Sequence, residues 1–139
     1  MLQFLLDTDH LTLFDHGSAP VIQRVVAHPL GAVGLPAVTV EEYLRGRLTS
    51  VAQAKDGASR VLRYAWFVET LKMLQQFEIA PFDQPAEDQF GLIRARQLRI
   101  GTQDQKIAAI AIACNVTLVT RNKRDFGQIL GLQLDDWSL

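Results

Sequence analysis

The sequence has very little cysteine, no long apolar run and almost no net charge. Its single cysteine, Cys114, excludes an internal disulfide and sits in an apolar helical pattern, which predicts a buried, unreactive thiol that suits a reducing cytosol. No apolar run approaches a membrane span, and Asp7 and Asp9 interrupt the apolar amino terminus before a signal-peptide core could form. We therefore expect a soluble, cytoplasmic protein without a membrane segment.

The chain also lacks a Gly/Ser linker, a low-complexity stretch and an evident repeat. With 139 residues, of which 48% are hydrophobic, it fits one domain that can bury a single core. We expect residues 1–139 to fold as one unit. The net charge of −1 gives no global argument for binding nucleic acid, because nucleic-acid-binding proteins are usually basic.

What the chain does contain is an alternation of apolar runs with helical patterns. Strands are expected at residues 2–6, 33–38, 77–82, 116–120 and 132–137. Helices are expected at about 11–27, from 40 onward, at 58–76, 85–98 and 103–114, with a short helix after Asp125. The helices that begin near residues 40 and 58 should form an antiparallel hairpin. This order predicts an α/β fold with a mainly parallel sheet between layers of helices.

Four acidic residues fall where such a fold would bring them together. Asp7 closes the first apolar run, Glu42 follows the second, Asp104 opens an apolar helical stripe, and Asp125 lies just past the run VTLVT. Parallel sheets place ligand sites at the carboxyl ends of their strands, and hard cations prefer carboxylate oxygens. The four acids therefore predict a site for Mg²⁺ or Mn²⁺.

The first two acids each have a structural alternative. Asp7 follows a strand and could simply cap the helix that comes next. Thr39 and Glu42 have the spacing of a capping box, in which Glu42 would reach back to the backbone N–H of Thr39. For both acids the structural and the functional explanations stay open at this point.

Asp104 is more informative. Helical spacing puts it on the apolar face that must pack on the sheet, where a bare charge is costly. Thr102 and Gln105 already resemble a capping box, so Asp104 is not needed for capping. Asp125 could start its own helix, but it follows a strand end rich in polar groups.

Basic residues lie beside three of the four acids. They fall in three groups: Arg45 and Arg47; Arg94, Arg96 and Arg99; and Arg121, Lys123 and Arg124. Their recurrence favours a polyanionic substrate, and the alternative is ordinary solvated helix faces. The candidates for contacts with RNA phosphates are Arg45, Arg99, Arg121 and Lys123. The three histidines, His10, His16 and His28, lack metal-ligand spacing with a carboxylate partner, so we predict structural roles for them.

Five segments carry a family resemblance: LLDTD, TVEEYLRG, IGTQDQKIAAIAIA, LVTRNKRDF and GLQLDDW. In this order and spacing they resemble PIN-domain ribonucleases, specifically the VapC-type toxins of prokaryotic toxin–antitoxin pairs. The resemblance implies a catalytic, metal-binding quartet of Asp7, Glu42, Asp104 and Asp125. The family pattern T-x-x-E-x-x-x-G selects Glu42 over Glu41 and ends at Gly46.

The resemblance also implies supporting residues and partners. Thr120 and Asn122 match polar positions that support the site, whereas Asp9 stands where many relatives carry Asn, so its role as ligand or supporting residue stays open. The implied fold is a three-layer PIN-like domain, and the implied partners are RNA and a cognate antitoxin. A homodimer is expected because relatives usually pair and because Trp66, Phe67 and Trp137 exceed an obvious core need.

Two other readings compete with this one. The run Asp7-Thr8-Asp9 resembles the nucleophile motif of haloacid-dehalogenase-type phosphatases, but Arg121 and Asn122 stand where that family expects an acidic pair. A receiver-like or purely interacting α/β module would leave Asp104 unexplained. The prediction is therefore a metal-dependent ribonuclease that hydrolyses phosphodiester bonds in RNA and acts as a toxin.

Overall fold

A computed structural model describes residues 1–139. The elements follow one another as β1 (Phe4–Leu6), α1 (Thr8–Asp15), α2 (Ala19–Val26), β2 (Val33–Pro36), α3 (Ala37–Ala52), α4 (Gly57–Leu74), β3 (Glu78–Ala80), α5 (Gln84–Ala95), α6 (Thr102–Cys114), β4 (Thr117–Val119), α7 (Lys123–Phe126) and β5 (Leu134–Asp135). The predicted alternation of strands and helices, and with it the α/β class, is confirmed.

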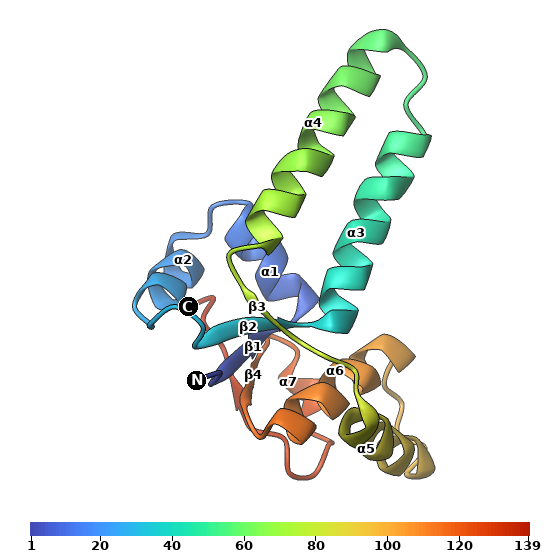
Figure 1. The fold of residues 1–139 in the computed structure, drawn as a ribbon. Helices are drawn as coiled ribbons and strands as arrows, with labels where there is room; N and C mark the ends of the chain where they lie inside the picture. Colours follow the sequence, from blue (N-terminus) through green and yellow to red (C-terminus); the bar gives the residue numbers. More distant parts are fainter.

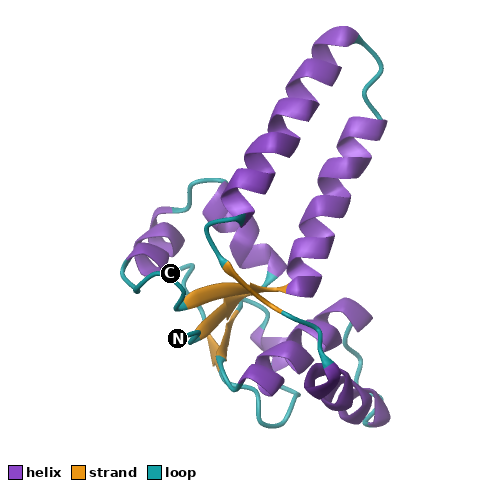
Figure 2. Cartoon of the chain, viewed as in Figure 1, coloured by secondary structure: helices purple, strands orange, loops and turns teal.

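The five strands form one parallel sheet in the order β3-β2-β1-β4-β5. The first strand is central, with Phe4 opposite Val33 of β2 on one side and opposite Thr117 of β4 on the other. Helices α1 to α4 lie on one side of the sheet, and α5 and α6 lie on the other (Figure 1). Figure 2 shows the resulting three layers, with the strands between the two sets of helices.

Two apolar cores follow from the pleat of the central strand, because successive residues of a strand point to opposite faces. Leu5 packs with Phe90 and Ile107 on the side of α5 and α6. Leu6 packs with Leu11 and Trp137 on the side of α1 and α2. Trp137 is fully buried, so it belongs to the core and is wrong as a motive for a dimer surface.

The helix expected at 11–27 is instead two helices, α1 and α2. The break comes at Gly17, whose φ of +89° is a backbone conformation that other residues rarely adopt. Pro20 then stands in the first turn of α2, where its missing N–H costs no helical hydrogen bond. The first helix also begins earlier than expected, at Thr8, because Asp7 caps it.

Neither of the capping boxes that the sequence allows is formed. The third helix begins at Ala37, directly after Pro36, so Thr39 lies buried within its first turn instead of capping it. The N-cap position of α6 is Gly101, not Thr102. The side-chain amide of Gln105 donates to the carbonyl of Ile100 at 2.7 Å, which ties α6 to the preceding turn.

The expected hairpin is formed by α3 and α4, which project together away from the sheet (Figure 1). Asp56 starts α4 by accepting a hydrogen bond from the backbone N–H of Ser59 at 2.7 Å. Cys114 is partly buried at the end of α6, and burial raises the pKa of its thiol, which agrees with an unreactive cysteine. None of the helices combines the length and the apolar character that crossing a membrane requires.

Candidate metal centre

The sequence-predicted acids come from four different elements at one edge of the sheet. Asp7 directly follows β1, Glu42 lies in α3 after β2, Asp104 lies in the first turn of α6, and Asp125 lies in α7 after β4. The strands β2, β1 and β4 are neighbours and parallel, so their carboxyl ends meet at this edge.

The electrostatics of Asp104 show that these side chains lie close together. Burial raises the pKa of its carboxyl group to about 6, and the carboxylates of Asp7, Glu42 and Asp125 add to the rise, in that order. Like charges raise a pKa only when they are near. The structure therefore brings together the four acids that the sequence singled out.

Asp7 is buried and caps α1, so the structural explanation of this residue is confirmed. Its Oδ1 accepts a hydrogen bond from the backbone N–H of His10 at 2.8 Å. No protein donor reaches its other oxygen, Oδ2, which leaves that oxygen available to a cation. The cap also fixes the direction of the carboxyl group.

Glu42 is oriented by a residue that the sequence reasoning missed. The hydroxyl of Thr8 donates to Glu42 Oε1 at 2.7 Å and lies 3.3 Å from the hydroxyl oxygen of Thr39. Thr8 stands between Asp7 and Asp9, so its place in the run DTD was a signal that could have drawn attention to it.

Asp125 is held by the two predicted supporting residues. The side-chain amide of Asn122 donates to Asp125 Oδ2 at 3.1 Å, and its carbonyl oxygen accepts from the backbone N–H of Asp125 at 3.3 Å. Thr120 is fully buried, and its hydroxyl accepts from the backbone N–H of Asn122 at 3.0 Å. The short helix therefore begins at Lys123 with Asn122 as its cap, and the expectation that it follows Asp125 was wrong.

Asp9 lies beside the cluster but is engaged by Arg121. The guanidinium of Arg121 donates from Nε and Nη2 to the two carboxylate oxygens at 2.7 and 2.8 Å. This bidentate pair holds the pKa of Asp9 below its usual range. Arg121, predicted to contact RNA, is therefore already paired in this structure.

His10 has a closer relation to the site than the sequence suggested. One potential ligand atom each of Asp7, Asp9 and His10 lies within 4.8 Å of the others. The imidazole is fully buried, and its Nε2 accepts from the backbone N–H of Trp137 at 3.2 Å, so in the neutral ring the proton is on Nδ1. That nitrogen lies 3.4 Å from Asp7 Oδ1, so the prediction that His10 lacks metal-ligand spacing with a carboxylate partner is wrong.

This geometry assigns His10 to the support of Asp7 more readily than to an ion. The ring is fully buried, and its Nδ1 borders Asp7 Oδ1 at 3.4 Å without a hydrogen-bond partner. A buried imidazole behind a metal-binding carboxylate is a common way of orienting that carboxylate.

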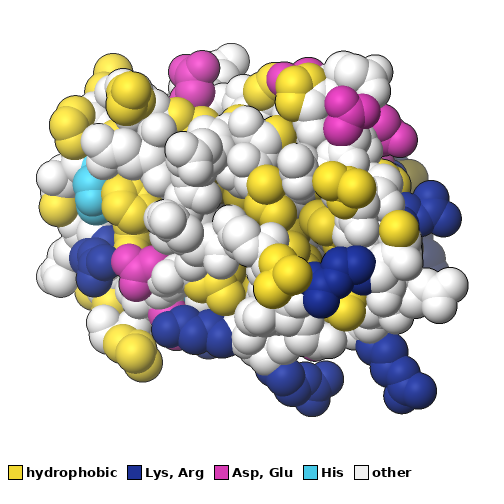
Figure 3. All heavy atoms as spheres, turned by 90° about the horizontal axis from the view of Figure 1, so that it is seen from below, with side chains coloured by type: hydrophobic (Ala, Val, Ile, Leu, Met, Phe, Trp, Pro, Cys, Tyr) yellow, Lys and Arg dark blue, Asp and Glu magenta, His cyan; other side chains and the backbone are white.

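The basic residues predicted to contact RNA differ in whether they already form an ion pair. Arg45 pairs with Glu41 at 2.6 Å, one helical turn away. Arg99 and Lys123 are exposed and make no ion pair, so they can reach a phosphate without breaking one. Seen from below, where α5 and α6 lie, Lys and Arg side chains gather along one edge of the molecule (Figure 3).

The donor set fits a divalent metal ion. It consists of carboxylate oxygens, which Mg²⁺ and Mn²⁺ prefer. Burial raises the pKa of Asp104 first and the three neighbouring carboxylates raise it further, so a cation between these groups would offset both effects.

A parallel three-layer α/β fold with clustered carboxylates at the carboxyl edge defines a class of metal-dependent nuclease domains. The family model that matches residues 5–130 is the PIN domain, and the chain belongs to this family. The predicted recognition is thereby confirmed, and membership of a nuclease family displaces the phosphatase and the non-enzymatic module.

Individual relatives agree with this family. The chain is 28% identical to the tRNA(fMet)-specific endonuclease VapC of Salmonella typhimurium over 99% of each protein. A DNA-bound VapBC structure from Salmonella typhimurium matches with a TM-score of 0.79 and 25% identity, covering 99% of both chains. VapBC2 of Rickettsia felis bound to a promoter fragment matches with a TM-score of 0.75 and 24% identity, over 98% of this chain and 99% of that one.

Proposed function

We propose that this protein is a ribonuclease that cleaves RNA with Mg²⁺ or Mn²⁺ held by Asp7, Glu42, Asp104 and Asp125, and that it acts as a toxin. The observation that carries the proposal is that four acids from separate elements meet at the carboxyl edge of the sheet, where burial and the carboxylates of Asp7, Glu42 and Asp125 raise the pKa of Asp104. The names of the VapC relatives, which are endonucleases specific for a tRNA, support RNA as the substrate class.

A metal ion held by these carboxylates would supply a water of lowered pKa and a positive charge for the phosphodiester. The residues of the chain position the reactants. Asp7 and Asp104 would offer carboxylate oxygens to the ion, while Thr8 and Asn122 hold Glu42 and Asp125 in position by hydrogen bonds. No side chain has to act as a covalent nucleophile.

Substrate binding requires cations, because the quartet itself repels phosphate. Arg99 and Lys123, which are exposed and unpaired, are the first candidates to hold the phosphates on either side of the cleaved bond. Arg45 and Arg121 can take part only if they leave Glu41 and Asp9.

The test is cleavage of total tRNA by purified protein with Mg²⁺, with Mn²⁺ and with excess EDTA. Wild-type protein should cleave only with a metal, and Asp104→Asn should cleave at least about a hundredfold more slowly than wild-type protein with either metal. Glu69→Gln is the matched control, because Glu69 is an exposed acid on α4 that pairs only with Lys72. Equal activity of wild-type protein with metal and with EDTA would refute the metal mechanism.

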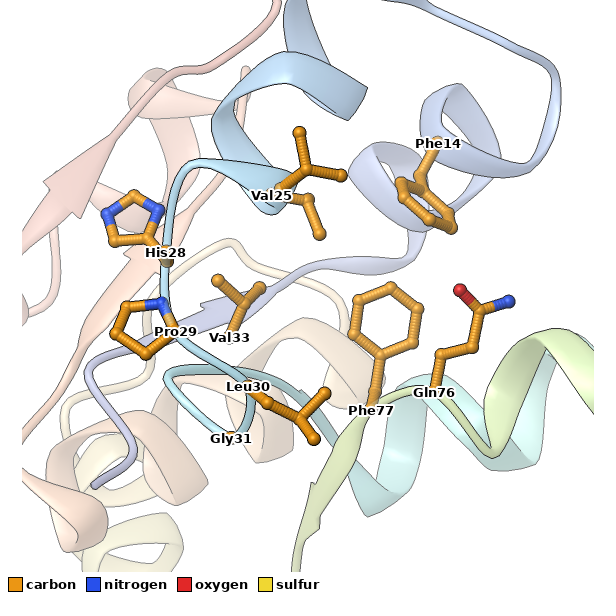
Figure 4. A pocket seen from close by; sticks show the side chains of 10 residues that line it. Phe14, Val25, His28, Pro29, Leu30, Gly31, Val33, Gln76 and Phe77 are labelled. Atoms are coloured by element: carbon orange, nitrogen blue, oxygen red, sulfur yellow. The ribbon is translucent and has the colours of Figure 1, made fainter.

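A cognate antitoxin belongs to the same proposal. An apolar hollow of about 270 Å³ lies among the ends of α1, α2 and α4, where Phe14 and Phe77 contact each other edge to face at 5.1 Å between ring centres (Figure 4). Such a hollow suits an apolar, helical antitoxin segment, from which a basic side chain would have to reach the acids. Expression of wild-type protein should arrest growth unless the antitoxin is co-expressed, and Asp7→Asn should not arrest it.

The proposal also includes a homodimeric state and a cytoplasmic location. Trp66 is 45% exposed on the projecting hairpin and Phe67 is partly exposed, which leaves apolar surface for a homodimer in the cytoplasm. Sedimentation at micromolar concentration should show a dimer, and a monomer alone would count against it.

A further inference from the structure

A polar pocket of about 340 Å³ lies beside Glu42, between α1 and α3. The first helix contributes one face, at intervals of four residues, and the third contributes the opposite wall. The lining residues are Thr8 and Thr12 from α1, His16 at its C-cap, and Glu42, Tyr43, Gly46 and Arg47 from α3. Because Glu42 also belongs to the acid cluster, the pocket opens directly next to the proposed metal site.

Gly46 keeps this pocket open. It lies within α3, where glycine is about 1 kcal/mol less favourable than alanine. A Cβ built at this position would meet no atom within 4 Å, so the fold does not require the glycine. A larger side chain at this position would instead reduce the free space between α1 and α3.

The walls of this pocket carry hydrogen-bonding groups, and the positive charge of Arg47, which lines it, is balanced by Asp15. Arg47 lies 3.5 Å from Asp15, and its Nε donates to Thr70 at 2.8 Å, so its charge is matched and its position is fixed. The hydroxyl of Thr12 and the exposed imidazole of His16 add polar groups. A phosphate would find too little positive charge here, whereas the polar edge of a nucleobase would find donors and acceptors.

The apolar hollow among the ends of α1, α2 and α4 shows by comparison what a site for an apolar protein segment looks like. The pocket at Phe14 and Phe77 has six hydrophobic residues among its ten lining residues (Figure 4). The pocket beside Glu42 has only one, Tyr43, among seven. This difference favours RNA over a protein segment as the occupant of the polar pocket.

We propose that the polar pocket between α1 and α3 binds one nucleobase of the RNA, adjacent to the phosphate that is cleaved. The inference rests on the proposed ribonuclease function and adds to it a place where the sequence of the RNA is read. His16 and Thr12 would contact the edge of the base, and Gly46 provides the room for it.

The experiment combines a variant whose side chain fills the pocket, Gly46→Leu, with RNA that lacks one base. Oligoribonucleotides that carry one abasic residue at each position around the cleavage site are compared with the intact RNA. For wild-type protein, one abasic position should lower kcat/KM by about tenfold, the size expected for loss of one bound base. Gly46→Leu should lower cleavage of intact RNA by a similar factor and show no further loss with that abasic RNA.

Gly91→Leu is the matched control, because Gly91 is also an exposed helical glycine with no atom within 4 Å of a built Cβ, but it lies on α5. It should cleave like wild-type protein. As a second variant, His16→Ala should narrow the difference in rate among the four bases at the sensitive position while cleaving the abasic RNA at the wild-type rate.

Three results would overturn the subsite. They are equal cleavage by Gly46→Leu and Gly91→Leu, equal losses by Gly46→Leu on intact and abasic RNA, and loss of antitoxin binding by Gly46→Leu with unchanged cleavage. The last result would make the pocket a protein site. Absence of any metal-dependent cleavage by wild-type protein would instead refute the proposed function, and this inference with it.

Discussion

Asp104 heads the apolar face of α6 and lies half-buried beside three other carboxyl groups. Asp7 is the most buried of the four acids and is already oriented by its helix cap. Glu42 is oriented by the hydroxyl of Thr8, and Asp125 is oriented by the side-chain amide of Asn122. The four acids of the proposed site therefore differ in how deeply they are buried and in how firmly their carboxyl groups are oriented.

These differences predict graded effects of substitution on RNA cleavage. Asp7→Asn and Asp104→Asn should each lower the rate by a hundredfold or more, on the order expected when a catalytic metal loses a ligand. Glu42→Gln should also lower it strongly, and Asp125→Asn the least. Rates measured on folded variants, checked by circular dichroism, decide this, and full activity of Asp7→Asn or Asp104→Asn would sink the mechanism.

The support of Asp125 gives a second prediction. Thr120→Val removes the hydroxyl that accepts from Asn122, so Asp125 should lose its orientation and cleavage should fall by roughly tenfold to a hundredfold. Asn122→Ala should have a similar effect, and added metal should restore either variant only in part. Thr120→Ser keeps the hydroxyl and should cleave at nearly the wild-type rate; if Thr120→Val does so too, the support is not needed.

At this scale the sequence predicted the acids but not all of their neighbours. The acids could be found because three of them follow apolar runs and Asp104 stands on an apolar helical face. Thr8 was missed because its partner, Glu42, lies 34 positions away. His10 was missed because its orientation depends on Trp137, which lies 127 positions away. Helical and strand periodicities relate residues that are close in sequence, so they could not reveal contacts between residues so far apart.

At the scale of elements, the strands and the hairpin could be predicted, whereas several helix boundaries could not. The apolar stripe continues across Gly17, so the break between α1 and α2 is visible only in the glycine and in Pro20. The start of α3 at Ala37 depends on the chain turning directly after Pro36, which propensity does not indicate. Where local signals were weak, packing decided the boundary.

Three helices meet at Arg47, which gives a prediction about stability. Its guanidinium contacts Asp15 of α1 and Thr70 of α4, and it lies over the rings of Tyr43 and Trp66. Lysine cannot reproduce this planar fork, so Arg47→Lys should lower the free energy of unfolding by about 1–2 kcal/mol.

The control is Arg45→Lys, two positions away in the same helix. Arg45 makes only an exposed ion pair with Glu41, so this variant should change stability by less than about 0.5 kcal/mol. Urea denaturation measures both. Equal stabilities of the two variants would show that Arg47 does not join the hairpin to α1.

For the whole molecule, the clustered acids make stability depend on pH. The pKa of Asp104 is about 6 in the folded protein against a reference value of 3.8, so between these values the folded state binds more protons than the unfolded state. The metal-free protein should therefore lose stability as the pH rises through this range.

Asp104→Asn removes this effect. Without metal it should be more stable than wild-type protein near pH 7, by roughly 1–2 kcal/mol once partial exposure is allowed for, and equal to it near pH 4. Thermal unfolding in EDTA across this range measures the difference. A variant that is less stable than wild-type protein at pH 7 in EDTA would show that Asp104 is not under electrostatic strain.

The central claim is that Asp7, Glu42, Asp104 and Asp125 together hold one divalent metal site, and binding of Mn²⁺ tests it most directly. Isothermal titration near neutral pH should show binding to wild-type protein and to Glu69→Gln with equal affinity. Each of the four single amide variants should bind at least tenfold more weakly, with Asp7→Asn and Asp104→Asn the weakest. Wild-type affinity in Asp104→Asn would contradict the account.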